Sequence, residues 1–442
     1  MTLKTSRRWS EGWHRSIAKL SGRVLTIAAG EGIARIGNLL LAVFIARVFG
    51  VAAAGAYALA QALALYQTQA TDFGLRHIGA RLIAQNPQHT AWVVRFVQRR
   101  RIVLALLMVT LGYIYGRLGP VPHDTRSIVS LYALSIFGYG LSLDWLAWGM
   151  QRFALMAGWR ALVSFLSVAV TIGCVRYLHA GLLIVPLANG LAYLAADLLL
   201  WSLWARRLIA AEIHPESSFI QPPGSDWKSL ALLGSALLLN QAFNSIDTMM
   251  LGSLTDSTQT GLYSAAYRLL LLVLAIYYLG MQAIYPQLAA IAEARRTMRL
   301  LWRPLIAAVA AGIAAAAVME ALRKPLVSLL YGPAFAASAT LAAPLLIAIP
   351  LDFATSFLVT ALTAWDHPRR VLTATALAAS GNVLLNCFLI PRYKAMGAAY
   401  ATPLSYLPYL LALLWQLHRV TAGSELAAAH SMTQTGSTGM LI

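Results

Sequence analysis

Apolar segments of about twenty residues recur along the whole chain and are separated by short polar connections. A helix needs roughly 20 mostly apolar residues to cross a bilayer, so this pattern predicts an all-α polytopic membrane protein with twelve transmembrane helices. The expected spans are 24–46, 52–72, 102–119, 128–150, 154–176, 181–204, 229–251, 261–286, 300–320, 338–362, 370–390 and 397–417.

The same layout occurs twice, which predicts two six-helix lobes. Gly55-Ala56-Tyr57 recurs 206 residues later as Gly261-Leu262-Tyr263, and Arg176-Tyr177 recurs as Arg392-Tyr393. Duplicated membrane helices with polar groups near mid-bilayer are typical of transporters that rock two halves around a central site. The two tyrosines after the glycines are expected to anchor their rings at the membrane interface.

The longest polar connection is rich in proline and serine and predicts a linker between the two lobes. The expected parts are a cytoplasmic N-terminal segment (1–21), an N-lobe (22–206), a cytoplasmic linker (207–228), a C-lobe (229–419) and a disordered cytoplasmic tail (420–442).

Composition supports a membrane protein rather than a nucleic-acid-binding one. Hydrophobic residues make up 59% of the chain and charged residues 11%, and the net charge is +18. The cations lie between the apolar runs instead of clustering on a soluble domain, which argues against nucleic acid as a partner. Lys and Arg are concentrated in the N-terminus and the even-numbered connections, so we expect both termini in the cytoplasm and the protein in the cytoplasmic (inner) membrane.

Two polar stripes lie inside the predicted spans. Glu31, Arg35 and Asn38 follow i, i+4, i+7 spacing in the first span, so they share one helix face. A charge at the centre of a membrane helix costs about 2.5–3.5 kcal/mol on insertion scales, which favours a wet cavity or a counter-charge around Arg35 and Arg268. The seventh span carries the matching stripe, which consists of Asn240, Gln241, Asn244 and Asp247.

At the repeat offset of 206, Asn244 corresponds to Asn38. The matching position favours a shared cavity lining in the two lobes. The alternative is a structural clamp, in which the stripes form hydrogen bonds with neighbouring helices. A further arginine, Arg160, lies early in the fifth span and is expected to extend its head to the cytoplasmic interface. Four aspartates are candidates to carry a coupled proton, although their faces are undecided: Asp72, Asp144, Asp197 and Asp352.

No motif for catalysis or nucleotide binding occurs in the sequence. The chain contains no G-x-x-x-x-G-K-[ST] phosphate loop, no H-E-x-x-H and no C-x-x-C. We therefore expect a protein that is not an enzyme and uses no cofactor and no metal, with transport driven by an ion gradient or by downhill flow. The two cysteines, Cys174 and Cys387, lie inside apolar runs and are expected to be small buried hydrophobic residues.

Several runs resemble the polysaccharide-transport (Wzx-type) flippases of the MOP superfamily. In the first half these are Ile45-Ala46-Arg47-Val48-Phe49-Gly50, Ala54-Gly55-Ala56-Tyr57-Ala58-Leu59-Ala60, Asp72-Phe73-Gly74-Leu75 and Gly79-Ala80-Arg81. In the second half they are Ile246-Asp247, Gly261-Leu262-Tyr263 and Tyr267-Arg268. The resemblance implies a MATE/MOP-like fold with two lobes in a V. It also implies a substrate in which a polyprenyl pyrophosphate carries an oligosaccharide, for lipopolysaccharide or exopolysaccharide biosynthesis.

That substrate suggests a role for each polar residue. Arg35 and Arg268 are expected to pair with pyrophosphate oxygens, because a guanidinium fork fits phosphate. Sugar hydroxyls would bond to Asn38, Asn240, Gln241 and Asn244, and ion coupling to H+ or Na+ would fall to Glu31 and Asp247. Membrane lipid, a polysaccharide polymerase and glycosyltransferases are the expected partners. A MATE-like cation or drug antiporter is the alternative, and a membrane polysaccharide polymerase or glycosyltransferase is a third possibility.

Overall fold

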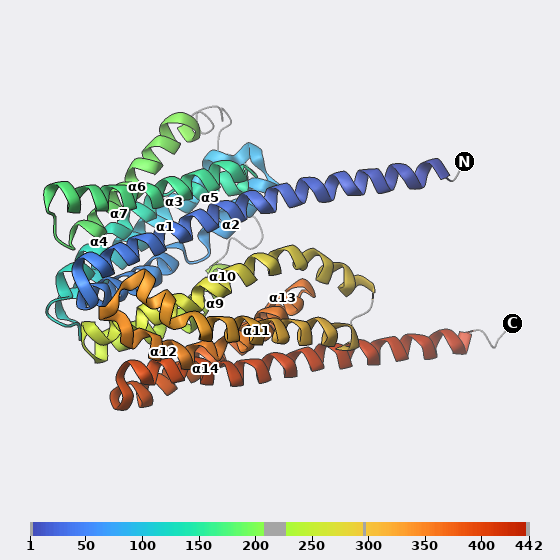
Figure 1. The fold of residues 1–442 in the computed structure, drawn as a ribbon. Coiled ribbons are helices and arrows are strands. Elements are labelled where there is room, and N and C mark those ends of the chain that lie inside the picture. Colours follow the sequence, from blue (N-terminus) through green and yellow to red (C-terminus); the bar gives the residue numbers. More distant parts are fainter. Residues whose placement is uncertain (1–2, 207–226, 295–297, 439–442) are drawn as a thin grey trace. The chain divides into compact units, whose positions relative to one another are not determined.

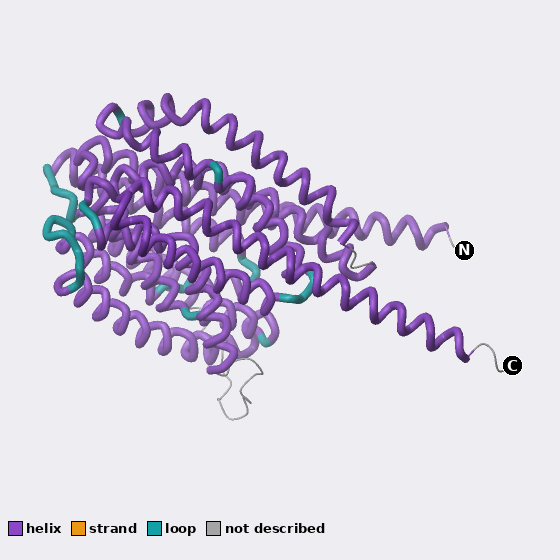
Figure 2. The backbone as a smooth tube through the Cα atoms, turned by 90° about the horizontal axis from the view of Figure 1, so that it is seen from below, coloured by secondary structure: helices purple, strands orange, loops and turns teal. Residues whose placement is uncertain are grey.

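The computed structural model describes residues 3–206, 227–294 and 298–438, and these residues form helices joined by short loops. No strand occurs among them, as the backbone tube in Figure 2 shows. This agrees with the all-α prediction. In a bilayer, a helix satisfies all of its backbone hydrogen bonds within one segment.

The first and last helices are long and each contains one break. Helix α1 (Leu3–Asp72) is interrupted at Gly50, where φ is 83°, and α14 (Pro368–Thr438) is interrupted at Lys394, where φ is 51°. Glycine adopts this left-handed conformation without the steric cost that a Cβ imposes. Each break divides its helix into two arms: 3–49 and 51–72 in α1, and 368–393 and 395–438 in α14 (Figure 1).

The remaining long helices cover the predicted spans, but α3 begins at Thr90 rather than 102 and α11 ends at Tyr331 rather than 320. In chain order they are α2 (Leu75–Gln85), η1 (Pro87–His89), α3 (Thr90–Leu118), α4 (Arg126–Leu141), α5 (Asp144–Gly149), α6 (Phe153–Leu178), α7 (Ile184–Leu200), η2 (Trp201–Ala205), α9 (Trp227–Leu254), α10 (Ser257–Ala294), α11 (Met298–Tyr331), η3 (Pro333–Phe335), α12 (Ala336–Leu346) and α13 (Ala348–Ala364).

Twelve membrane spans can be counted among these helices. Within the described ranges, eight helices are long and apolar enough to cross a membrane, and the bent pair of α12 and α13 provides a ninth. Two of the eight, α1 and α14, contain two arms each and therefore supply two further spans. Helix α9 has 28 residues, which is long enough to cross, and it carries the second polar stripe. The prediction of twelve transmembrane helices is confirmed.

The chain forms two compact units, Met1–Gly261 and Leu262–Ile442. In unit 1, the first arm of α1 packs on α6 and the second arm packs along α9, while α3 packs on α4. In unit 2, α13 packs against α11 and α14. Unit 1 thus includes α9, so these packing units and the predicted six-helix lobes divide the chain at different places. The lobe boundaries remain a prediction.

Tyr57 and Tyr263 are core residues rather than interfacial anchors. Their side chains are only 1% and 0% exposed. The Tyr57 hydroxyl accepts a hydrogen bond from Gln61 Nε2 at 3.1 Å, and the Tyr263 hydroxyl lies 3.2 Å from Thr402 Oγ1. A buried tyrosine is stable when its hydroxyl has such a partner. The expectation of anchoring was therefore wrong at both positions.

Candidate functional site

A cluster of buried charges lies where α1 ends and α2 begins. Asp72 is the last residue of α1, and the next two residues, Phe73 and Gly74, both have positive φ angles, 37° and 82°. This turn starts α2 at Leu75, so Arg76 follows Asp72 by only four residues. A phenylalanine in this region is strained, and such strain persists only where the surroundings hold it in place.

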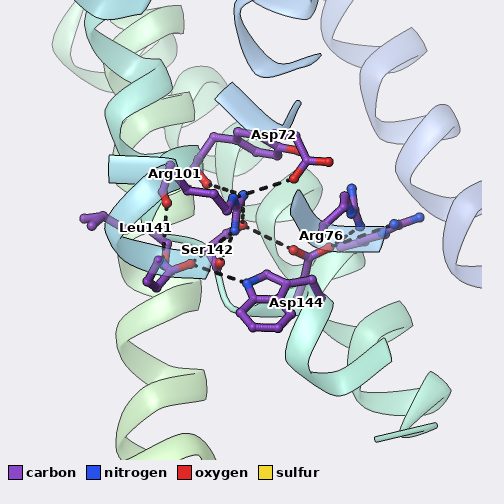
Figure 3. Close-up of polar contacts among 11 residues, drawn as sticks. Asp72, Arg76, Arg101, Leu141, Ser142 and Asp144 are labelled. Atoms are coloured by element: carbon purple, nitrogen blue, oxygen red, sulfur yellow. Dashed lines mark hydrogen bonds and ion pairs between the residues drawn. The ribbon is translucent and has the colours of Figure 1, made fainter. Parts of the chain in front are cut away.

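Arg101 of α3 binds the end of α4 from within the protein. Its side chain is fully buried and donates hydrogen bonds to the carbonyl oxygens of Ser142 at 2.6 Å and Tyr139 at 3.1 Å (Figure 3). Its Nε lies 3.6 Å from Asp72 Oδ1. The last carbonyls of a helix lack partners within that helix and carry partial negative charge. The guanidinium of Arg101 therefore has two roles, because it caps the end of α4 and balances the charge of Asp72.

A second ion pair extends the cluster to α5. Arg76 Nη2 lies 2.8 Å from Asp144 Oδ2, and the Ser142 hydroxyl donates to Asp144 Oδ1 at 3.2 Å. Arg160 of α6 lies 3.9 Å from the same carboxylate. The head of Arg160 is therefore within ion-pair distance of Asp144, and its extension to the cytoplasmic interface stays a prediction. Asp197 lies apart from these ion pairs and accepts a hydrogen bond from Trp159 Nε1 at 2.9 Å.

Unit 2 contains a different kind of buried carboxylate. Asp352 of α13 is 3% exposed. It accepts hydrogen bonds from Tyr406 at 2.6 Å, Tyr278 at 2.9 Å and Ser356 at 3.0 Å. Within the described part of the chain, Asp352 forms no ion pair. Three hydroxyl donors from α10, α13 and α14 thus converge on one carboxyl group without a cation.

The predicted polar stripe of α9 contains two separate hydrogen-bonded pairs, Asn240 with Asn244 and Gln241 with Ser245. Asn244 Nδ2 donates to the Asn240 carbonyl oxygen at 2.7 Å and to Asn240 Oδ1 at 3.1 Å. Gln241 Nε2 donates to the Ser245 hydroxyl at 2.7 Å. Asp247 is buried, with 2% of its side chain exposed. The amides of Asn240, Gln241 and Asn244 remain exposed or half-buried, which leaves them accessible to a ligand.

The other predicted residues lie on separate elements. Arg35 and Asn38 have exposed side chains on the first arm of α1, which packs against α6 through contacts such as Ser164 Oγ to the Ala34 carbonyl oxygen. Arg268 is half-buried on α10 in unit 2, beside the Tyr331 phenol. Glu31 lies outside the residues whose side chains the structure describes. The structure thus gathers the α9 residues, and a common substrate site with Arg35 and Arg268 remains a prediction.

Sequence reasoning missed the role of Arg76 and Arg101, because both lie in or beside the basic connection after the second predicted span, where cations were interpreted as topology signals. A signal for Arg101 was present, because Val97, Arg101 and Ala105 follow i, i+4, i+8 spacing and all three are fully buried. The neighbouring Arg99 is exposed. One arginine of the basic run therefore continues the buried face of α3, whereas its neighbours lie on another face.

The sequence also matches a known family. The family model described as "Polysaccharide biosynthesis protein" matches residues 22–292, which is more than half of the chain. The chain belongs to this polysaccharide biosynthesis protein family. No curated protein sequence is similar enough to match.

Solved structures share the fold of this chain. The lipid II flippase MurJ in an inward closed conformation aligns with a TM-score of 0.70 at 14% identity, over 91% of this chain and 91% of that one. An inward-facing multidrug resistance MATE transporter of the MOP superfamily gives 0.68 at 13% identity, over 89% and 96%. A MOP superfamily transporter from Pyrococcus furiosus gives 0.58 at 15% identity, over 90% and 94%. These likenesses show the fold, which is that of MOP-superfamily transporters.

Proposed function

We propose that this protein is a flippase that moves a polyprenyl-pyrophosphate-linked oligosaccharide across the cytoplasmic membrane by alternating access. The product would supply the assembly of a surface polysaccharide or an exopolysaccharide. The observation that carries the proposal is the match to a polysaccharide biosynthesis family over residues 22–292. The MOP transporter fold supports it, because the same architecture holds a lipid II flippase.

The polar residues of the spans suit the chemistry of this substrate. Arg35, whose side chain is exposed, and Arg268 would bind the pyrophosphate through paired hydrogen bonds from the guanidinium. The accessible amides of Asn240, Gln241 and Asn244 would bond to sugar hydroxyls, together with Asn38. The prenyl tail would stay in the lipid during transfer.

Reconstitution tests this function directly. Purified protein in vesicles should move a fluorescent polyprenyl-pyrophosphate-linked oligosaccharide to the opposite leaflet, measured by quenching with a membrane-impermeant reductant. Translocation of organic cations with no effect on the lipid-linked oligosaccharide would instead identify a drug antiporter. Extension of the glycan chain in the same vesicles would identify a polymerase.

The distribution of cations predicts the orientation of the chain. Reporter fusions at Gln221 and His367 should be active in the cytoplasm, and fusions at Thr258 and Ala395 should be active outside it. The reason is the excess of Lys and Arg in the connections that precede odd-numbered spans. Alkaline phosphatase fusions report the positions outside the cytoplasm, and green fluorescent protein fusions report the cytoplasmic ones. Reporter activity outside the cytoplasm at His367 would contradict the prediction that both termini are cytoplasmic.

Ion coupling is a further part of the proposal. Besides Glu31 and Asp247, it involves Asp352, one of the four aspartates that the sequence offers as carriers of a coupled proton. A buried carboxylate inside a membrane span carries an electrostatic cost, so its retention points to a functional role. Its three partners all donate hydroxyl hydrogens, and protonation would remove its charge. A carboxylate binds either H+ or Na+, so both are candidates for the ion that drives transport.

We expect Asp352→Asn to abolish the stimulation of transport by an imposed ion gradient, because an amide neither ionises nor binds a cation as a carboxylate does. Transport in vesicles with and without a pH or Na+ gradient measures this effect. Asp366→Asn is the matched control, since Asp366 is exposed and lies two residues beyond the end of the same helix. Gradient stimulation that persists in Asp352→Asn would remove this residue from the coupling mechanism.

A further inference from the structure

The repeated glycines meet one another in the structure. The second arm of α1 crosses the first turns of α10 so closely that a Cβ on Gly55 would collide with the Ser257 carbonyl oxygen. A Cβ on Gly261 would likewise collide with the carbonyl oxygen of Val51. Each glycine therefore faces the carbonyl four residues before the other glycine. The contact is reciprocal, and both residue pairs are separated by the repeat offset of 206 residues.

Hydrogen bonds join the same ends of the helices. The Ser257 hydroxyl donates to Asp124 Oδ2 at 2.9 Å and lies 2.9 Å from Thr125 Oγ1. Nearby, the Tyr115 and Ser253 hydroxyls lie 2.7 Å apart. The Thr125 and Ser257 side chains are only 1% and 6% exposed, so water is largely excluded from their contact.

All these contacts connect the first half of the sequence to the second. Tyr115 lies in the last turn of α3, Asp124 and Thr125 precede α4, and Gly55 lies on α1. By contrast, Ser253, Ser257 and Gly261 lie on α9 and α10. Every one of them lies inside unit 1. The break at Gly50 and the connections between α3 and α4 and between α9 and α10 are all expected outside the cytoplasm. The contacts therefore gather at one predicted face of the membrane.

We propose that Gly55, Gly261, Asp124, Thr125 and Ser257 form an outer latch, which closes the extracytoplasmic side of the transport path and opens once in each cycle. The inference rests on the proposed alternating access. Small residues allow two helices to approach closely without side chains that interlock. Hydroxyl and carboxylate partners can exchange their mutual hydrogen bonds for bonds to water when the helices separate. Both features suit a contact that forms and breaks repeatedly.

A reversible cross-link tests whether the latch must open. In a background with Cys174→Ser and Cys387→Ser, the pair Thr125→Cys and Ser257→Cys brings two thiols within reach of a disulfide, because the native oxygens lie 2.9 Å apart. Oxidation should reduce vesicle transport to the level of empty vesicles, and a reductant should restore it. Each single-cysteine variant is the matched control and should transport equally with and without oxidant. Full transport by the cross-linked protein, or failure of the pair to cross-link, would overturn the proposal.

A second measurement does not depend on the substrate. Gly55→Val should hold the latch open, whereas Gly158→Val should have no effect, since a Cβ there has no neighbour within 4 Å. Thr260 lies beside the latch and is 0% exposed. A cysteine at this position is therefore buried when the latch is closed and accessible when it is open. An impermeant thiol reagent added outside should label Thr260→Cys at least several-fold faster with Gly55→Val than with Gly158→Val. Equal labelling would contradict the latch, whereas faster labelling without oligosaccharide flux would contradict only the proposed function.

Discussion

Replacement of Arg101 with alanine should destabilise the protein by about 3–5 kcal/mol, the usual cost of removing one partner of a buried ion pair. Several acceptors depend on this guanidinium, among them the carbonyl oxygens of Ser142 and Tyr139 and the carboxylate of Asp72. Without it, the end of α4 loses its cap and the buried Asp72 carboxylate loses its ion pair with Arg101. The loss should appear as a lower unfolding temperature in detergent and a smaller amount of protein in the membrane.

Arg99→Ala is the matched control, because Arg99 lies two residues earlier on the same helix and its side chain is exposed. Its unfolding temperature should equal that of the wild type. Arg101→Lys should recover only part of the stability, since an ammonium group lacks the planar fork that reaches several acceptors at once. Equal unfolding temperatures for Arg101→Ala and Arg99→Ala would show that the buried cluster does not stabilise this end of α3 and α4.

The spans were predictable because each depends on local apolar length. The break in α1 coincides with Gly50, and the interruption of α14 falls between the predicted spans 370–390 and 397–417. The connection between Asn240 and Asn244 was also predictable, since residues four apart share a helix face. These features follow from the sequence within one or two turns of helix.

The buried ion cluster was not predictable in the same way, because its partners come from distant segments. Arg101 pairs with residues 29 positions before it and 41 positions after it, and Arg76 pairs with Asp144, 68 positions away. Hydrophobic periodicity gives the inward face of one helix but not the helix that lies opposite. The burial of Tyr57 was not predictable either, since an aromatic ring near the start of a helix suits the membrane interface and the protein core equally well.

Arg35→Ala should reduce oligosaccharide flux by roughly 10- to 150-fold while the protein still inserts into the membrane. A charged hydrogen bond contributes about 1.5–3 kcal/mol, and each 1.36 kcal/mol corresponds to a tenfold change. The exposed guanidinium lies between the exposed side chains of Ile33 and Ile36, in a span that would otherwise suit lipid. Arg47→Ala is the matched control, because Arg47 is also exposed on the same arm of α1 but lies near its end. Its flux should change little.

The rival explanation is that Arg35 only neutralises Glu31, four residues earlier on the same helix face. In that case the double variant Glu31→Ala with Arg35→Ala should transport better than Arg35→Ala alone, because no unpaired charge would remain. If Arg35 binds the pyrophosphate instead, the double variant should fail as completely as the single one, and Arg35→Lys should recover only part of the flux. Initial rates in vesicles with matched amounts of inserted protein separate these outcomes. Recovery of flux in the double variant would exclude Arg35 as a substrate ligand.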